Sequence, residues 1–171
     1  MLSTSSRARR LLAAVCIALA LVGSGCSDSR EIERVTTAVR DYNTQLVRAF
    51  AAHDMNLLGT VATRDQAYTE YSQMAALGES GLTLHATLRD ITFDSVSFSG
   101  DASATADTTE TWDYKHVSND TSETVRTESG VTYRLRYQLV LRDERWLVSD
   151  VRSLDTTGTS QTTTPSEVTT P

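Results

Sequence analysis

The sequence predicts an α+β fold in which three N-terminal helices pack on a curved antiparallel sheet. Two patterns lead to this fold class. Apolar residues recur at helical spacing up to Leu77, and from Gly81 onward they alternate with polar residues as in half-buried strands. Of the 171 residues, 39% are hydrophobic and 22% are charged. This length and composition indicate one folded domain with one core, flanked by tails.

The first helix is expected to begin next to Asp28 and Ser29, because both residues suit a helix start and Glu31 can complete a capping box with Asp28. A single apolar stripe follows at helical spacing. Its members are Ile32, Val35, Val39, Tyr42, Leu46 and Phe50.

Two further helices are predicted by their caps. After a break at His53, Asp54 can cap a short helix that contains Met55, Leu57, Leu58 and Val61. Thr63 together with Gln66 can cap a third helix before Gly78 ends it. This third helix is expected to present Ala67, Tyr71, Met74 and Leu77 to the core.

Four strands are predicted after these helices. The first alternates from Leu82 to Leu88 and slips phase before Ile91, as a bulged strand would. Turns at 99–101 and 118–120 bound a Thr-rich second strand. The third begins after Gly130 and has an apolar face opposite a mostly basic or polar face, so the sheet should have one buried side. After a turn at 142–145, the last strand is expected to run from Trp146 to Leu154.

The N-terminal residues 1–25 have the order of a secretory signal peptide: basic residues, an apolar run, and then small residues before Cys26. Small residues followed at once by cysteine look like a lipobox, in which Cys26 would be diacylated and become the first residue. A departure from that pattern is Gly23, which stands where an aliphatic residue is usual. There are two alternatives to lipidation at Cys26. The chain could be cleaved nearby and released as a free domain, or residues 1–25 could remain as an uncleaved signal anchor.

The predicted organisation is therefore a signal peptide over 1–25, a short tether over 26–30, a folded domain over 31–155 and a Thr/Ser/Pro-rich tail over 156–171. The expected location is extracytoplasmic, at the cell membrane or cell envelope, with the chain held to the membrane by lipid.

Charge and residue type exclude several classes of function. The signal peptide carries three arginines and no acidic residue, so its removal changes the net charge of −6 to −9. Such an acidic chain repels nucleic acid. The folded domain has no cysteine, and His53, His85 and His116 do not stand at ligand spacing, so neither a metal nor a cofactor is expected.

Two candidate sites emerge from the strands and helices. Arg134 and Arg136 share one face of a strand, where they could pair with Glu110 or receive the acidic terminus of a peptide. With Trp112 or Tyr114 they would supply the anchors typical of protein interfaces. The alternative site is an interior cavity, and its expected walls are Tyr42, Tyr71, Tyr133 and Tyr137, with Trp112.

The second half of the chain resembles a known family. The residues that carry the resemblance are Leu88–Val96, Thr109-Glu110-Thr111, Thr132–Leu139 and Trp146-Leu147-Val148. They are similar to the IMS domain of plastid-division proteins of the ARC-six type, within the cystatin-like, nuclear transport factor 2-like superfamily. The resemblance spans about residues 31–154. It implies a cone-shaped fold, non-catalytic binding of a partner membrane protein, and dimerisation through the sheet, but no role in division.

The function expected from the sequence is that of an envelope lipoprotein whose domain binds a protein or peptide through its sheet. A carrier that holds a small ligand in an apolar cavity is the alternative. An isomerase- or dehydratase-like enzyme of the same fold is a third reading. It would need an ionisable group on the apolar face, and the pattern assigns none there, so no enzymatic activity is expected.

Overall fold

The computed structural model describes residues 24–155 and confirms the predicted α+β class. Helices come first and a four-stranded antiparallel sheet follows in the order β1-β2-β3-β4. The elements are α1 (Ser24–Ala52), the 3₁₀ helix η1 (Met55–Thr60), α2 (Arg64–Glu79), β1 (Leu82–Phe98), β2 (Ser103–Ser118), β3 (Thr124–Arg142) and β4 (Arg145–Ser153). Residues 1–23 of the predicted signal peptide and the predicted tail over 156–171 lie outside the described residues.

The helix α1 is longer than the capping pattern predicts. It begins at Ser24, so residues 26–30, expected as a tether, are helical. The apolar stripe is buried at Val35, Val39 and Tyr42, whereas Ile32 is 40% exposed. The helix ends where predicted, because His53 adopts a φ of 54° and breaks the hydrogen-bonding pattern.

The two predicted caps are formed. The Asp54 side chain accepts a hydrogen bond from the backbone N–H of Asn56 at the start of η1. The Thr63 side chain accepts from the backbone N–H of Gln66 at the start of α2. Short polar side chains at these positions satisfy N–H groups that have no partner inside the helix.

The buried face of α2 differs from the expected one. Gln66, Glu70 and Met74 face the core at a spacing of four residues, whereas Tyr71 is 49% exposed and its ring lies 6.3 Å from that of Tyr68. The prediction that Tyr71 faces the interior is therefore wrong. The helix is rotated so that two polar side chains point inward, which an apolar stripe cannot reveal.

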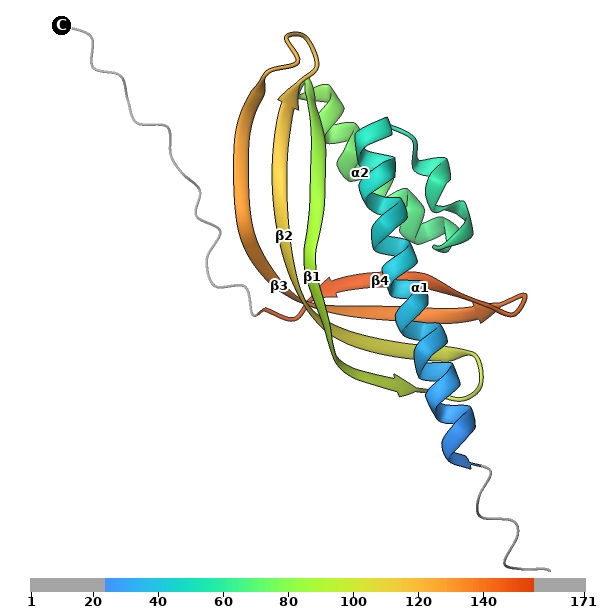
Figure 1. Cartoon of the computed structure of the whole chain (residues 1–171). Helices are drawn as coiled ribbons and strands as arrows, with labels where there is room; N and C mark the ends of the chain where they lie inside the picture. Colours follow the sequence, from blue (N-terminus) through green and yellow to red (C-terminus); the bar gives the residue numbers. More distant parts are fainter. Residues whose placement is uncertain (1–23, 156–171) are drawn as a thin grey trace, which may run out of the picture.

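Bulges shape the sheet. The register between β1 and β2 shifts between Leu88 and Asp90, where the sequence predicts it, and again between Phe93 and Ser95. A bulge bends its strand and increases the local twist. The long strands curve accordingly, and α1 and α2 lie on the concave side of the sheet (Figure 1).

The strand β3 begins at Thr124, before the predicted start at Gly130. Gly130 lies inside the strand with a φ of 68°, in a bulge of β3 where Ser129 and Gly130 together stand opposite Asp113 of β2. The N–H of Gly130 donates to Asp113 Oδ1 at 2.8 Å. The turn from β3 to β4 has positive φ at Asp143 and Glu144, the conformation of a tight hairpin.

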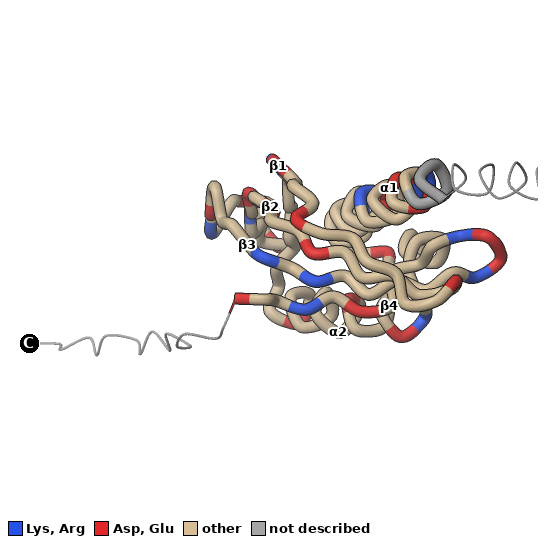
Figure 2. Tube along the Cα trace, turned by 90° about the horizontal axis from the view of Figure 1, so that it is seen from below, with Lys and Arg blue, Asp and Glu red and all other residues tan. Residues whose placement is uncertain are grey.

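The main core lies between the helices and the inner face of the sheet. Its fully buried members include Val35, Val39, Leu58, Leu139 and Val148. Basic and acidic residues are interspersed along the trace (Figure 2). Among the described residues, no helix is both long and apolar enough to cross a membrane.

Candidate ligand-binding cavity

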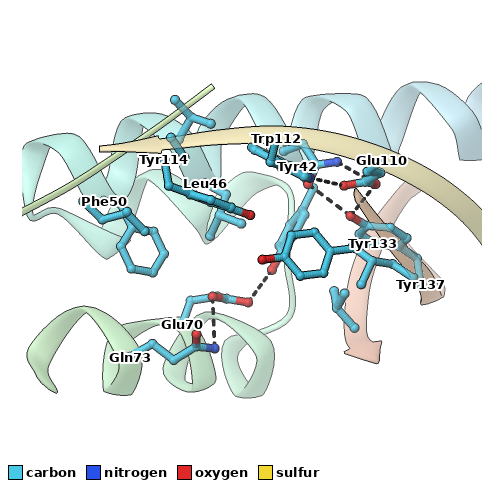
Figure 3. A pocket seen from close by; sticks show the side chains of 16 residues that line it. Tyr42, Leu46, Phe50, Glu70, Gln73, Glu110, Trp112, Tyr114, Tyr133 and Tyr137 are labelled. Carbon is cyan, nitrogen blue, oxygen red and sulfur yellow. Dashed lines mark hydrogen bonds between the residues drawn. The ribbon is translucent and has the colours of Figure 1, made fainter. Parts of the chain in front are cut away.

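A cavity of about 270 Å³ lies between the two α-helices and the concave face of the sheet (Figure 3). Aromatic side chains form much of its wall: Tyr42, Phe50, Trp112, Tyr114, Tyr133 and Tyr137. The remaining lining residues are Asn43, Leu46, Val47, Glu70, Gln73, Leu84, Ala86, Glu110, Leu135 and Val151. Long aromatic side chains from β2 and β3 meet α1 and α2 here, because the bent sheet holds the helices away from its inner face.

The structure places three of the four predicted wall residues around this cavity. Tyr42, Tyr133 and Tyr137 line it, as does Trp112, while Tyr71 lies on the outside of α2. The Tyr42 and Tyr137 rings are almost fully buried and meet edge to face in this wall, with centroids 6.1 Å apart.

The predicted protein-binding surface is not assembled. Trp112 is only 5% exposed and Tyr114 lines the cavity, whereas Arg134 and Arg136 are exposed and belong to the opposite set of β3 positions. The aromatic and basic residues therefore occupy different faces, because side chains alternate along each strand.

The predicted pairing of Glu110 with Arg134 is also wrong. Glu110 lies opposite Tyr133 in the ladder and points into the core, while Thr109 lies opposite Arg134. Arg136 instead holds Asp107 through two hydrogen bonds of 2.7 Å, and this ion pair holds the pKa of the Asp107 carboxyl below its usual range.

Glu110 is the centre of a buried polar network. It is fully buried, and its Oε1 accepts from Tyr137 Oη at 2.8 Å, Thr108 Oγ1 at 3.0 Å and Asn43 Nδ2 at 3.2 Å. Its Oε2 accepts from Trp112 Nε1 at 2.8 Å. Four donors thus satisfy the Glu110 carboxyl in place of water, so this polar side chain can occupy the core.

Glu70 is the second carboxylate in the cavity wall, on the α2 side opposite Glu110 (Figure 3). It is 8% exposed, and its Oε1 accepts from Tyr42 Oη and Gln66 Nε2, both at 2.8 Å. Burial raises the pKa of the Glu70 carboxyl, and these two donors oppose the shift without cancelling it. An acid group with a raised pKa inside a cavity is a recurring mark of functional sites.

The tyrosines around these carboxylates remain protonated. Burial, together with the nearby carboxylates, raises the pKa of Tyr42 and Tyr137, and burial beside Tyr133 raises that of Tyr114. They therefore act as hydrogen-bond donors or as apolar walls, and not as bases.

Sequence reasoning missed both buried carboxylates, and its expectation that the apolar face carries no ionisable group is wrong. The signal for Glu110 was present: on β2 the inward positions are Ala104, Ala106, Thr108, Glu110 and Trp112, with a period of two. For Glu70, the signal was its position between Gln66 and Met74, at a spacing of four residues that puts all three on one helix face. In each case the polar residue was predicted to face solvent, and this prediction is wrong.

The histidines stand apart from the cavity. His53 Nε2 lies 2.5 Å from Thr83 Oγ1, His85 is exposed and His116 is partly buried. In residues 24–155, no three or more His, Cys, Asp or Glu side chains are grouped so that they could hold a metal ion.

Helices that cover the concave face of a bent antiparallel sheet, with a cavity between them, define a domain of the nuclear transport factor 2-like class. The YvbJ NTF2-like domain matches residues 35–152, and the chain belongs to this family. The predicted place in the cystatin-like, nuclear transport factor 2-like superfamily is thereby confirmed.

Among solved structures, the intermembrane space region of the chloroplast protein ARC6 is similar to this chain, with a TM-score of 0.59 and 19% identity over 70% of this chain and 92% of that one. This likeness shows the shared fold and agrees with the resemblance seen in the sequence. A structure from Catenulispora acidiphila matches with a TM-score of 0.43 and 13% identity, covering 74% of this chain and 94% of that chain. No curated protein matches the sequence.

Proposed function

We propose that this chain is a lipid-anchored, extracytoplasmic protein that binds a small organic ligand in the cavity between its helices and sheet, without catalysing a reaction. The observation that carries the proposal is the cavity itself. Ligand sites in proteins are concave and mainly apolar, and this space of about 270 Å³ opens to the surface between the helices and the sheet, so a small molecule can enter it.

The distribution of polar groups also supports binding. Ligand sites are mainly apolar, with a few polar groups that orient the ligand. Here aliphatic and aromatic side chains provide the walls, and Glu70 and Gln73 present polar atoms on the α2 side (Figure 3). Glu110 is engaged by four protein donors, so its role is to hold the wall in place.

The absence of catalysis is part of the proposal. Glu70 is the one wall residue whose carboxyl combines a raised pKa with spare hydrogen-bonding capacity among the described residues. Acid–base chemistry usually also needs a second group that takes up or returns the proton. The neighbouring tyrosines have raised pKa values and are poorly suited to that part.

The anchor is proposed at Cys26, from the lipobox-like sequence. The N-terminal end of α1 projects beyond the sheet (Figure 1). The first cavity residue on α1 is Tyr42, so about 24 Å of helix separates Cys26 from the cavity. A lipid on Cys26 would therefore hold the cavity away from the membrane surface.

Binding of a protein through the sheet receives less support. The outer face of β3 keeps Arg134 and Arg136, but the aromatic anchors expected beside them line the cavity instead. Arg136 is also engaged by Asp107. What remains on that face is a polar, charged surface of the kind that usually faces water.

The test of ligand binding uses the fluorescence of Trp112, which lines the cavity. Trp146 lies outside it, so the Trp146→Phe variant leaves Trp112 as the single reporter. Titration with 2-phenylethanol should change its emission and saturate. Ala86→Phe, placed in the cavity wall, should abolish the change, whereas Thr87→Phe on the neighbouring exposed position should preserve it. An unsaturable signal, or equal binding by both variants, would count against the cavity.

The anchor is tested separately, by metabolic labelling with a fatty-acid probe. Wild-type protein should take up the label and Cys26→Ser should not. Equal labelling of the two would remove lipidation at Cys26 from the proposal and leave the cavity untouched.

A further inference from the structure

We propose that the ligand of this cavity is a small organic cation, an amine attached to an apolar or aromatic group, whose ammonium is bound by Glu70. This inference rests on the proposed function and adds the charge and size of the ligand. Three features of the cavity carry it: the charge of its lining, the Glu70 oxygen that has one long hydrogen bond, and the aromatic walls.

The first feature is charge. Among the described residues that line the cavity, two are glutamates and none is Arg, Lys or His. The arginines of β3 lie on the outer face, where Arg136 is paired with Asp107. In a low-dielectric interior such a lining attracts a cation and repels an anion, so carboxylate and phosphate ligands are disfavoured.

The second feature is the difference between the two carboxylates. Glu110 is fully buried, accepts three hydrogen bonds at Oε1, and accepts a short one from Trp112 Nε1 at Oε2, 2.8 Å long. At Glu70, Oε1 accepts from Tyr42 and Gln66. Its Oε2 has one long contact within the described part of the chain, from Gln73 Nε2 at 3.5 Å. A carboxylate oxygen can accept two hydrogen bonds, so Oε2 has room for an ammonium donor.

The third feature is the aromatic wall. The Trp112 and Tyr114 rings are stacked with an interplanar angle of 9°, and Tyr133 meets Tyr114 edge-on at 70°, so these rings form a continuous aromatic surface. Together with Phe50 they provide apolar surface for the rest of the ligand.

The size of the cavity limits the ligand. A water molecule has a share of about 30 Å³ in the liquid. The cavity of about 270 Å³ therefore holds about nine waters, so the part of the ligand that lies inside it has roughly ten non-hydrogen atoms. A phenyl ring with a two-carbon amine has this size.

Binding of such a cation should release a proton. Burial raises the pKa of Glu70, and an ammonium beside Oε2 favours the ionised form, so the bound state lowers it again. The titratable groups that line the cavity with Glu70 are Tyr42 on α1, Glu110 and Tyr114 on β2, and Tyr133 and Tyr137 on β3. Affinity for the amine should therefore increase with pH until Glu70 is ionised in the free protein.

The test compares three probes that share a phenyl group: 2-phenylethylamine, 2-phenylethanol and 3-phenylpropanoate. Their affinities for the mature protein are measured by calorimetry at pH 7. We expect the amine to bind on the order of tenfold more tightly than the alcohol, because the charge-assisted hydrogen bond to Glu70 outweighs the desolvation of the ammonium. The carboxylate should bind more weakly than the alcohol.

Variants locate the effect. Glu70→Gln keeps the side-chain volume and removes the charge, so it should abolish the preference for the amine and retain binding of the alcohol. Glu79→Gln removes an exposed carboxylate from the same helix and should leave the preference unchanged. If the alcohol binds as tightly as the amine, or Glu70→Gln keeps the preference, the cation inference fails while the proposed function stands. If none of the three probes binds, the proposed function fails as well.

Discussion

Replacement of Glu110 by glutamine should destabilise the fold more than its conservative character implies. The carboxylate accepts from Tyr137, Thr108 and Asn43 at one oxygen and from Trp112 at the other. Glutamine offers one carbonyl oxygen and one NH₂ group. When the carbonyl faces the three donors, the NH₂ group faces the indole N–H of Trp112, and a buried donor loses its acceptor.

The size of the effect follows from this count. A buried donor left without an acceptor costs about 1–3 kcal/mol. The three contacts at the other oxygen are kept, but the new NH₂ group is a second buried donor that faces no acceptor there. We therefore expect Glu110→Gln to lower the free energy of unfolding by about 2–4 kcal/mol. Glu123→Gln, at an exposed position, should change it by less than about 0.5 kcal/mol.

The assay is equilibrium unfolding in urea, followed by far-ultraviolet circular dichroism. A double-mutant cycle with Trp112→Phe isolates the cost of the unpaired indole N–H, since phenylalanine has no N–H group. The cost of Glu110→Gln should be smaller in the Trp112→Phe background. A loss within 0.5 kcal/mol of zero, or an equal loss in both backgrounds, would refute the assignment of Glu110 as the centre of the network.

Three further outcomes are expected in the same unfolding assay. The folded-state pKa of Glu70 is raised above its ordinary value of 4.5, so the folded protein holds this proton more tightly than the unfolded chain. The free energy of unfolding of the wild type, relative to that of Glu70→Gln, should therefore fall as the pH rises from 4.5 to the raised pKa, and stay constant above it. A pH-independent difference between the two proteins would contradict the raised pKa. Leu58→Ala, at a fully buried position, should cost about 2–5 kcal/mol, against less than about 0.5 kcal/mol for the exposed Val125→Ala. Thr63→Ala should cost about 1 kcal/mol through loss of the cap on α2, and Thr63→Ser should restore most of it.

Much of the fold could be predicted because local patterns decide it. The caps at Asp54 and Thr63, the turns and the bulge after Leu88 all follow from residue types at fixed spacing. The starts of α1 and β3 were misplaced for a related reason. A capping residue such as Asp28 is compatible with a helix interior, and Gly130 is compatible with a strand interior because it lies in a bulge of β3, where glycine accommodates the positive φ.

The site was predicted in part only. The tyrosines of β3 and α1 lie on apolar stripes and were assigned to the interior. Glu70 and Glu110 were not, because burial of a carboxylate depends on donors from several elements, and no local pattern shows that Asn43, Trp112 and Tyr137 converge on one oxygen pair. The separation of Trp112 from Arg134 likewise depends on cross-strand register, which a sequence of alternating residues leaves open.

Whether the cavity is a binding site can be tested most directly by a crystal structure of the protein soaked with 2-phenylethylamine. We expect difference density inside the cavity, with the amine within hydrogen-bond distance of Glu70 Oε2 and the phenyl group against Phe50 and Tyr114. Density only on the outer face of the sheet beside Arg134, or an unchanged interior at saturating probe, would contradict the proposal that this protein binds its ligand between helices and sheet.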